Sequence, residues 1–89
     1  MRGPRRRARP PFRILRAAEL LDVSAEACVA VEDSPNGALA AERAGAAVLV
    51  VPCGVPVPAG PRRTFRNDLV GLTARELGTV WRTASERVA

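Results

Sequence analysis

The 89-residue sequence contains no histidine and no tyrosine, and because all 14 of its basic residues are arginine it contains no lysine either. Without histidine there is no imidazole base for a serine or cysteine nucleophile and no imidazole metal ligand. Any acid–base or metal chemistry therefore depends on the nine carboxylates. The only aromatic residues are Phe12, Phe65 and Trp81, which leaves alanine, valine and leucine to build the core.

Cysteines and long apolar runs are also scarce. Cys28 and Cys53 lie in or beside apolar runs and lack metal-ligand spacing, which predicts two buried free thiols rather than a disulfide. No segment approaches the roughly eighteen consecutive apolar residues of a membrane span, and no apolar signal core follows the N-terminal arginines. We therefore expect a soluble, unexported, cytoplasmic protein with no membrane partner.

The net charge of +5 is concentrated at the N-terminus. Residues 1–16 contain seven arginines and no acid, whereas residues 17–89 contain seven arginines and nine acids. Residues 1–13 combine arginine, proline and glycine with little apolar content, so we expect a disordered tail ahead of one folded domain over residues 14–89. Because arginine clusters bind phosphates, nonspecific binding of nucleic acid or another polyanion through this tail is one alternative function.

The centre of the chain has the pattern of an α/β domain. Short apolar runs near residues 28–32 and 47–51 predict two buried strands. Between them Ser34 is a good helix N-cap and Gly45 a good C-terminal stop, which predicts a helix over residues 35–44. A strand, a helix of this length and a second strand form the usual crossover of a parallel sheet.

The flanking segments give weaker signals. Apolar residues at helical spacing, among them Leu15 and Leu21, predict a helix over residues 14–22, and the proline and glycine content of residues 52–63 predicts an irregular loop. The arginines in and after that loop are either solvated or contact a substrate phosphate; they are Arg62, Arg63 and Arg66. A capping box from Thr73 to Glu76 marks a last helix. Its apolar face, which we assign to the core, comprises Leu77, Val80, Trp81, Ala84 and Val88.

Two adjacent carboxylates, Glu32 and Asp33, follow the first predicted strand. Open parallel sheets place their ligand sites at this end of their strands, and the N–H groups of the next helix attract anions. Carboxylates with no histidine or cysteine nearby favour Mg²⁺ over zinc. The alternative is structural: Asp33 and Ser34 only cap the helix, while Glu32 is solvated.

Residues 31–37, Val-Glu-Asp-Ser-Pro-Asn-Gly, are followed by Ala40-Ala41, Ala44-Gly45 and the apolar run of residues 48–52. This pattern closely resembles the fourth motif region of haloacid-dehalogenase-like (HAD) hydrolases of the β-phosphoglucomutase-like subgroup, and weaker similarity extends over residues 14–80. The resemblance implies the C-terminal part of a Rossmannoid parallel sheet. It also implies a Mg²⁺-dependent phosphatase or phosphomutase that acts on small phosphorylated metabolites.

The same resemblance implies roles for four residues. Asp33 would be a direct ligand of Mg²⁺, and Glu32 would be a second ligand or would support the first. Ser34 and Asn36 would shape the loop on the phosphate side. The cation would neutralise charge on a phosphoryl group and orient it for attack.

The sequence also departs from the family pattern. The attacking aspartate of the family belongs to a D-x-D motif, but none of the three aspartates here lies two positions from another. Where the family has lysine followed by proline, this chain has Arg9-Pro10. We therefore expect a fragment that is inactive alone. Another alternative is a partner-binding fragment that pairs through an exposed sheet edge, with itself or with a homologous chain.

Overall fold

The computed structural model describes residues 11–88. Its elements in chain order are α1 (Phe12–Leu20), the 3₁₀ turn η1 (Ala25–Ala27), β1 (Val29–Glu32), α2 (Pro35–Ala44), β2 (Ala47–Val50), β3 (Arg63–Phe65) and α3 (Ala74–Val88). The three strands form one parallel sheet in the order β1-β2-β3. The predicted α/β class, and the parallel pairing of the first two strands around a helix, are thereby confirmed.

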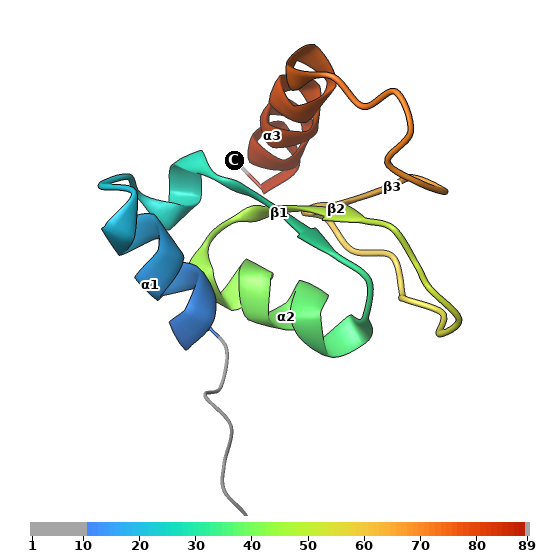
Figure 1. Cartoon of the computed structure of the whole chain (residues 1–89), viewed down its shortest axis with the longest axis horizontal. Helices are drawn as coiled ribbons and strands as arrows, with labels where there is room; N and C mark the ends of the chain where they lie inside the picture. The colour runs from blue at the N-terminus through green and yellow to red at the C-terminus, as the bar shows by residue number, and fades with distance from the viewer. Residues whose placement is uncertain (1–10, 89) are drawn as a thin grey trace, which may run out of the picture.

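The sheet lies between two helical layers, with α3 on one face and α2 on the other, where α1 packs beside α2 (Figure 1). All four residues of β2 are buried, because side chains alternate between the two faces and both faces are covered. Val48 and Val50 pack toward α2, while Leu49 packs against Val80 and Ala84 of α3. Within the described residues every buried apolar side chain is alanine, valine or leucine, as the composition predicted.

The bounds of α2 are those the sequence predicted. The hydroxyl of Ser34 accepts a hydrogen bond from the backbone N–H of Gly37 (3.1 Å), and Pro35 occupies the first turn, where its missing N–H costs nothing. Gly45 ends the helix with φ of 100°, a left-handed conformation that glycine adopts without a Cβ penalty. These local signals fix where α2 begins and ends.

The capping box of α3 is also confirmed. The N–H of Glu76 donates to the Thr73 hydroxyl (3.1 Å), and the N–H of Thr73 donates to the Glu76 carboxylate (3.0 Å). Trp81 is not in the core as predicted: it is 37% exposed at the rim, where its indole N–H donates to the carbonyl of Glu26 (2.8 Å). None of the helices within residues 11–88 has both the length and the apolar character needed to cross a membrane.

The N-terminal boundary differs from the prediction. Helix α1 begins at Phe12, two residues before the predicted start, so Phe12 and Arg13 belong to a helix rather than to the expected tail. The predicted disorder of residues 1–10 lies outside the described residues. Ala18 is buried, but Leu15 and Leu21 are 44% and 70% exposed, because a helix on the outer side of α2 has only a narrow buried stripe.

The predicted irregular loop after β2 is confirmed over residues 52–62, but a short strand that was not predicted follows it. The expected irregular segment over residues 52–63 ends at β3, whose three residues pair with Val48, Leu49 and Val50. Such a short strand has too few residues for an alternating pattern, so only its pairing with β2 reveals it. Cys53 is exposed rather than buried, because the buried run ends at Val50, while Cys28 is half-buried and both thiols are free.

Candidate functional site

The two predicted carboxylates lie at the carboxyl edge of the sheet. Glu32 is the last residue of β1, and Asp33 begins the turn into α2. The backbone of this edge is fixed by the N–H of Val51, which donates to the Glu32 carbonyl (2.9 Å). Asp33 is exposed, whereas Glu32 is half-buried. The structure thus brings the pair to the place where parallel α/β sheets put ligands.

The Glu32 carboxylate folds back over the first turn of α2. One of its oxygens lies where a Cβ on Gly37 would be, so the glycine leaves the space that this carboxylate fills. Burial raises the pKa of Glu32 above its ordinary value of 4.5, and repulsion from the neighbouring Asp33 raises it further. A cation at this edge would offset the repulsion between the two carboxylates.

Gly37 is the residue that sequence reasoning left without a role. Its position in the first turn of a helix, where an acidic residue is usually favoured, is the signal that could have identified it. Gly37 does not have a left-handed backbone conformation. A side chain is excluded there because the Glu32 carboxylate fills the space.

The N-terminus of α2 contributes little anion-binding capacity. Pro35 has no N–H, and the N–H of Gly37 is already bonded to the Ser34 hydroxyl. Asn36, expected to shape the loop, is exposed at the second helical position, and its backbone N–H remains available among the contacts of the described residues. Ser34 therefore acts as the helix cap, and the phosphate-side role expected of Ser34 and Asn36 reduces to this one N–H.

Two carboxylates are the donors that this edge offers to a metal. No group of three or more histidine, cysteine, aspartate or glutamate side chains that could hold a metal occurs within residues 11–88. Mg²⁺, however, keeps several waters and is commonly bound through one or two carboxylates together with substrate phosphates. The pair of Glu32 and Asp33 fits such an open site, and it does not fit a closed all-protein cage.

The three arginines in and after the loop, Arg62, Arg63 and Arg66, are each bonded within the fold. Arg62 donates to two carbonyls just after α2 (2.7 and 3.1 Å), and Arg63 forms a two-pronged pair with Glu42 (both 2.8 Å). Arg66 pairs with Glu76 (2.9 Å) and donates to two loop carbonyls (2.7 and 2.6 Å). All three guanidinium groups are structural, which corrects both readings of this segment.

The arginines of the N-terminal tail give no defined interface. Five of them, Arg2, Arg5, Arg6, Arg7 and Arg9, lie outside the described residues. Arg13 and Arg16 lie on α1, and the guanidinium of Arg16 pairs with Glu19 (2.7 Å) on the same helix. The polyanion-binding alternative thus gains no support from the described residues.

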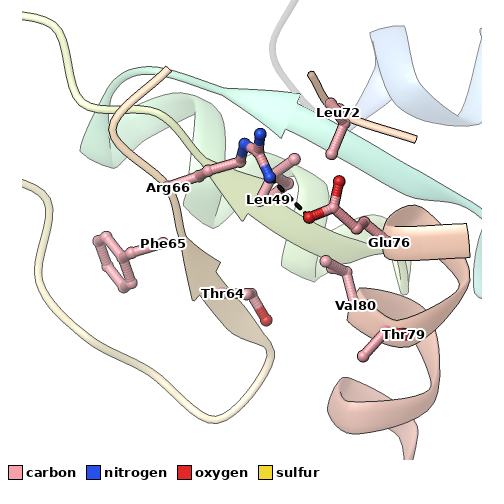
Figure 2. Close-up of a pocket in the computed structure, with 8 residues that line it drawn as sticks. All are labelled: Leu49, Thr64, Phe65, Arg66, Leu72, Glu76, Thr79 and Val80. Carbon is pink, nitrogen blue, oxygen red and sulfur yellow. Dashed lines mark hydrogen bonds and ion pairs between the residues drawn. The ribbon is translucent and has the colours of Figure 1, made fainter. Parts of the chain in front are cut away.

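A separate groove of about 290 Å³ lies between β3 and α3. Figure 2 shows Leu49 and Val80 lining it and the ion pair of Arg66 and Glu76 spanning it. The hydroxyl of Thr64 is buried there without a hydrogen-bond partner among the described residues. Neither Glu32 nor Asp33 lines this groove, so the space and the carboxylates belong to different parts of the molecule.

The fold and this edge define a small parallel α/β domain with an acidic pair at the carboxyl ends of its strands. Comparisons with protein-family models, with curated proteins and with solved structures give no match for this chain. The acidic edge and the sequence pattern that produces it are therefore the features that indicate a function.

Proposed function

We propose that this chain is the metal-binding part of a HAD-like, Mg²⁺-dependent phosphohydrolase of the phosphatase or phosphomutase type. The observation that carries the proposal is the adjacency of Glu32 and Asp33 at the carboxyl edge of a parallel sheet, directly before the N-terminus of α2. A cytoplasmic location, supported by the two free cysteines, belongs to the same proposal.

The chemistry assigned to this chain is electrostatic. When Mg²⁺ is bound, it would offset the negative charge on a phosphoryl group of a small phosphorylated metabolite. Asp33 is exposed in the turn that follows β1, so it is the direct ligand in this proposal. Glu32 is held back against Gly37, and it supports the cation from the protein side.

The chain supplies no attacking group of the HAD type. Its three aspartates are Asp22, Asp33 and Asp68, and none forms a D-x-D motif. In this proposal the covalent step belongs to residues outside this sequence. The role of the chain is then to position a cation rather than to complete a reaction.

The test is a Mg²⁺ titration of the 89-residue chain. Binding is measured by calorimetry and by changes in the backbone NMR chemical shifts. We expect Asp33→Asn to lower the affinity by about tenfold or more, and Glu32→Gln to lower it by less. Glu86→Gln, which removes one exposed carboxylate from α3, is the control and should leave the affinity unchanged.

Equal affinities in the wild type and in both edge variants would contradict the proposal. The carboxylates would then have the structural role alone, in which Asp33 and Ser34 belong to the cap of α2. Shifts that spread over the surface instead of the residue 32–37 segment would contradict it as well.

A further inference from the structure

The two edges of the sheet differ in how their outward backbone groups are used. In β3 the carbonyl of Arg62 and the N–H of Arg66 bond to β2, so the backbone of Arg63 faces outward. Its N–H donates to the Gly60 carbonyl (3.1 Å), and its carbonyl accepts from the Arg87 side chain (3.4 Å). A loop and a charged side chain thus block this edge, as edge strands of monomeric proteins commonly require.

The edge formed by β1 has no comparable protection among the described residues. The carbonyls of Cys28 and Glu32 accept from β2, so the N–H and carbonyl groups of Val29 and Val31 face away from the sheet. Neither valine receives a side-chain hydrogen bond within residues 11–88. The side chain of Val31 is 44% exposed beside a strand that is wholly buried. An open, apolar edge of this kind is a template for another strand.

We propose that β1 is an interface at which two copies of this chain pair antiparallel, with Ala30 of each copy on the two-fold axis. This pairing needs no metal at Glu32 and Asp33. It uses the edge at which the rest of the proposed enzyme's sheet would continue, because the β3 edge is blocked. The register is self-complementary, because Val29 of each copy then faces Val31 of the other. Their outward groups exchange four backbone hydrogen bonds. The axis is perpendicular to the sheet, so both copies keep α3 on one face and α2 on the other.

Repulsion between the two Glu32 carboxylates favours the register with Ala30 on the axis over the register with Val31 on the axis. With Ala30 on the axis, the two Glu32 residues are four positions apart along the ribbon, which is about 13 Å. That separation exceeds the screening length of about 8 Å at physiological salt. Placing Val31 on the axis would halve the separation to about 7 Å and bring the like charges within each other's range. The small side chain of Ala30 also permits close approach at the axis.

The junction is short, so the dimer is weak. Two four-residue strands bury less than the roughly 1,200 Å² of a stable interface. Association should therefore depend on concentration over the micromolar to millimolar range, on the order of 10 μM to 1 mM. The measurement is sedimentation velocity of the 89-residue chain across that range.

Two edge variants test the interface. Val31→Lys places a charge on the edge, and Val31→Pro removes an outward N–H without touching the ladder to β2. Each should raise the dissociation constant by about tenfold or more. The matched control is Leu39→Lys, because Leu39 is 41% exposed but lies on α2, and this variant should dimerise like the wild type.

Cross-linking tests the register independently of affinity. In a chain carrying Cys28→Ser and Cys53→Ser, Ala30→Cys should form an intermolecular disulfide, because residues on the axis have Cα atoms about 4.5 Å apart. The chain with Val55→Cys in place of Ala30→Cys, at an exposed loop position, should cross-link far more slowly. A wild type that stays monomeric at about 1 mM, or a dimer unaffected by both Val31 variants, overturns the proposal. Equal cross-linking at the two positions also overturns it.

Discussion

The position of the Glu32 carboxylate depends on Gly37, which has no side chain to occupy the same space. The space beside Gly37 lets this carboxylate lie over the first turn of α2, where burial and Asp33 together raise its pKa. A glycine in a helix costs up to about 1 kcal/mol relative to alanine. The helix accepts that cost at Gly37, because the Glu32 carboxylate occupies the space beside it.

We predict that Gly37→Ala moves Glu32 into solvent. The new Cβ would overlap the carboxylate oxygen, and this flexible side chain can turn away, so stability should change by no more than about 1 kcal/mol. The pKa of Glu32 should fall toward 4.5 as its burial is lost, which a carboxyl-carbon NMR titration measures.

Gly78→Ala is the control for this substitution. Gly78 lies in α3, where a Cβ would meet only the end of Arg82 at an ordinary 3.5 Å, so the helix gains stability and Glu32 does not move. An unchanged Glu32 pKa in Gly37→Ala would show that the carboxylate does not depend on the glycine.

At the scale of elements, the ends of α2 and α3 are fixed by short-range hydrogen bonds. In α3 the capping box has a second function, because Glu76 also pairs with Arg66 in the loop after β3 (2.9 Å). The backbone hydrogen bond from Thr73, and then the bond from Arg66, lower the pKa of Glu76 below its ordinary value of 4.5. One carboxylate thus joins the start of α3 to the end of the sheet.

This linkage predicts a pH-dependent contribution to stability. Because the pKa of Glu76 is lower in the folded state, its stabilisation is present above about pH 4.5 and is lost as pH falls through the folded pKa. Glu76→Gln should therefore lower the free energy of unfolding at pH 7, and the difference should shrink in acid. Urea unfolding at pH 7 and at pH 3 measures it; a difference that is constant with pH would contradict the assignment.

At the scale of the whole molecule, the ion pair of Arg63 and Glu42 connects the loop and β3 to α2. Its two hydrogen bonds are both 2.8 Å, and the side chains are only 10% and 19% exposed. The bond to Glu42 raises the pKa of Arg63, so the pair stays charged. With a core of small side chains, such a tie between distant segments supports the packing of the sheet edge.

We expect no phosphate-ester hydrolysis by the 89-residue chain on its own. With Mg²⁺ and a simple phosphate ester, the 89-residue chain should release phosphate no faster than its Asp33→Asn variant, because a cation without a nucleophile omits the covalent step. Loss of a nucleophile costs many orders of magnitude in rate. A phosphate-release assay with both proteins is the measurement, and hydrolysis that disappears in Asp33→Asn would contradict the expectation.

The fold could be predicted where the signals are local. Ser34, Pro35 and Gly45 determine the ends of α2, and the two apolar runs around it determine β1 and β2, so the parallel unit followed from the sequence. The sequence also placed Glu32 at the end of the first strand and Asp33 directly after it. Helix α1 was predicted less well. Leu15, Ala18 and Leu21 recur at helical spacing, but only Ala18 is buried.

The sequence by itself determined the strand–helix–strand unit, the capping of both later helices and the acidic edge, because short apolar runs and helix caps are each encoded by residues close together in the chain. Only the tertiary structure decided the existence of β3, the pairing of Arg63 with Glu42, the burial of Glu32 and the exposure of the β1 edge. These features join segments that are distant in the chain or arise from what covers a surface, and no local pattern encodes either.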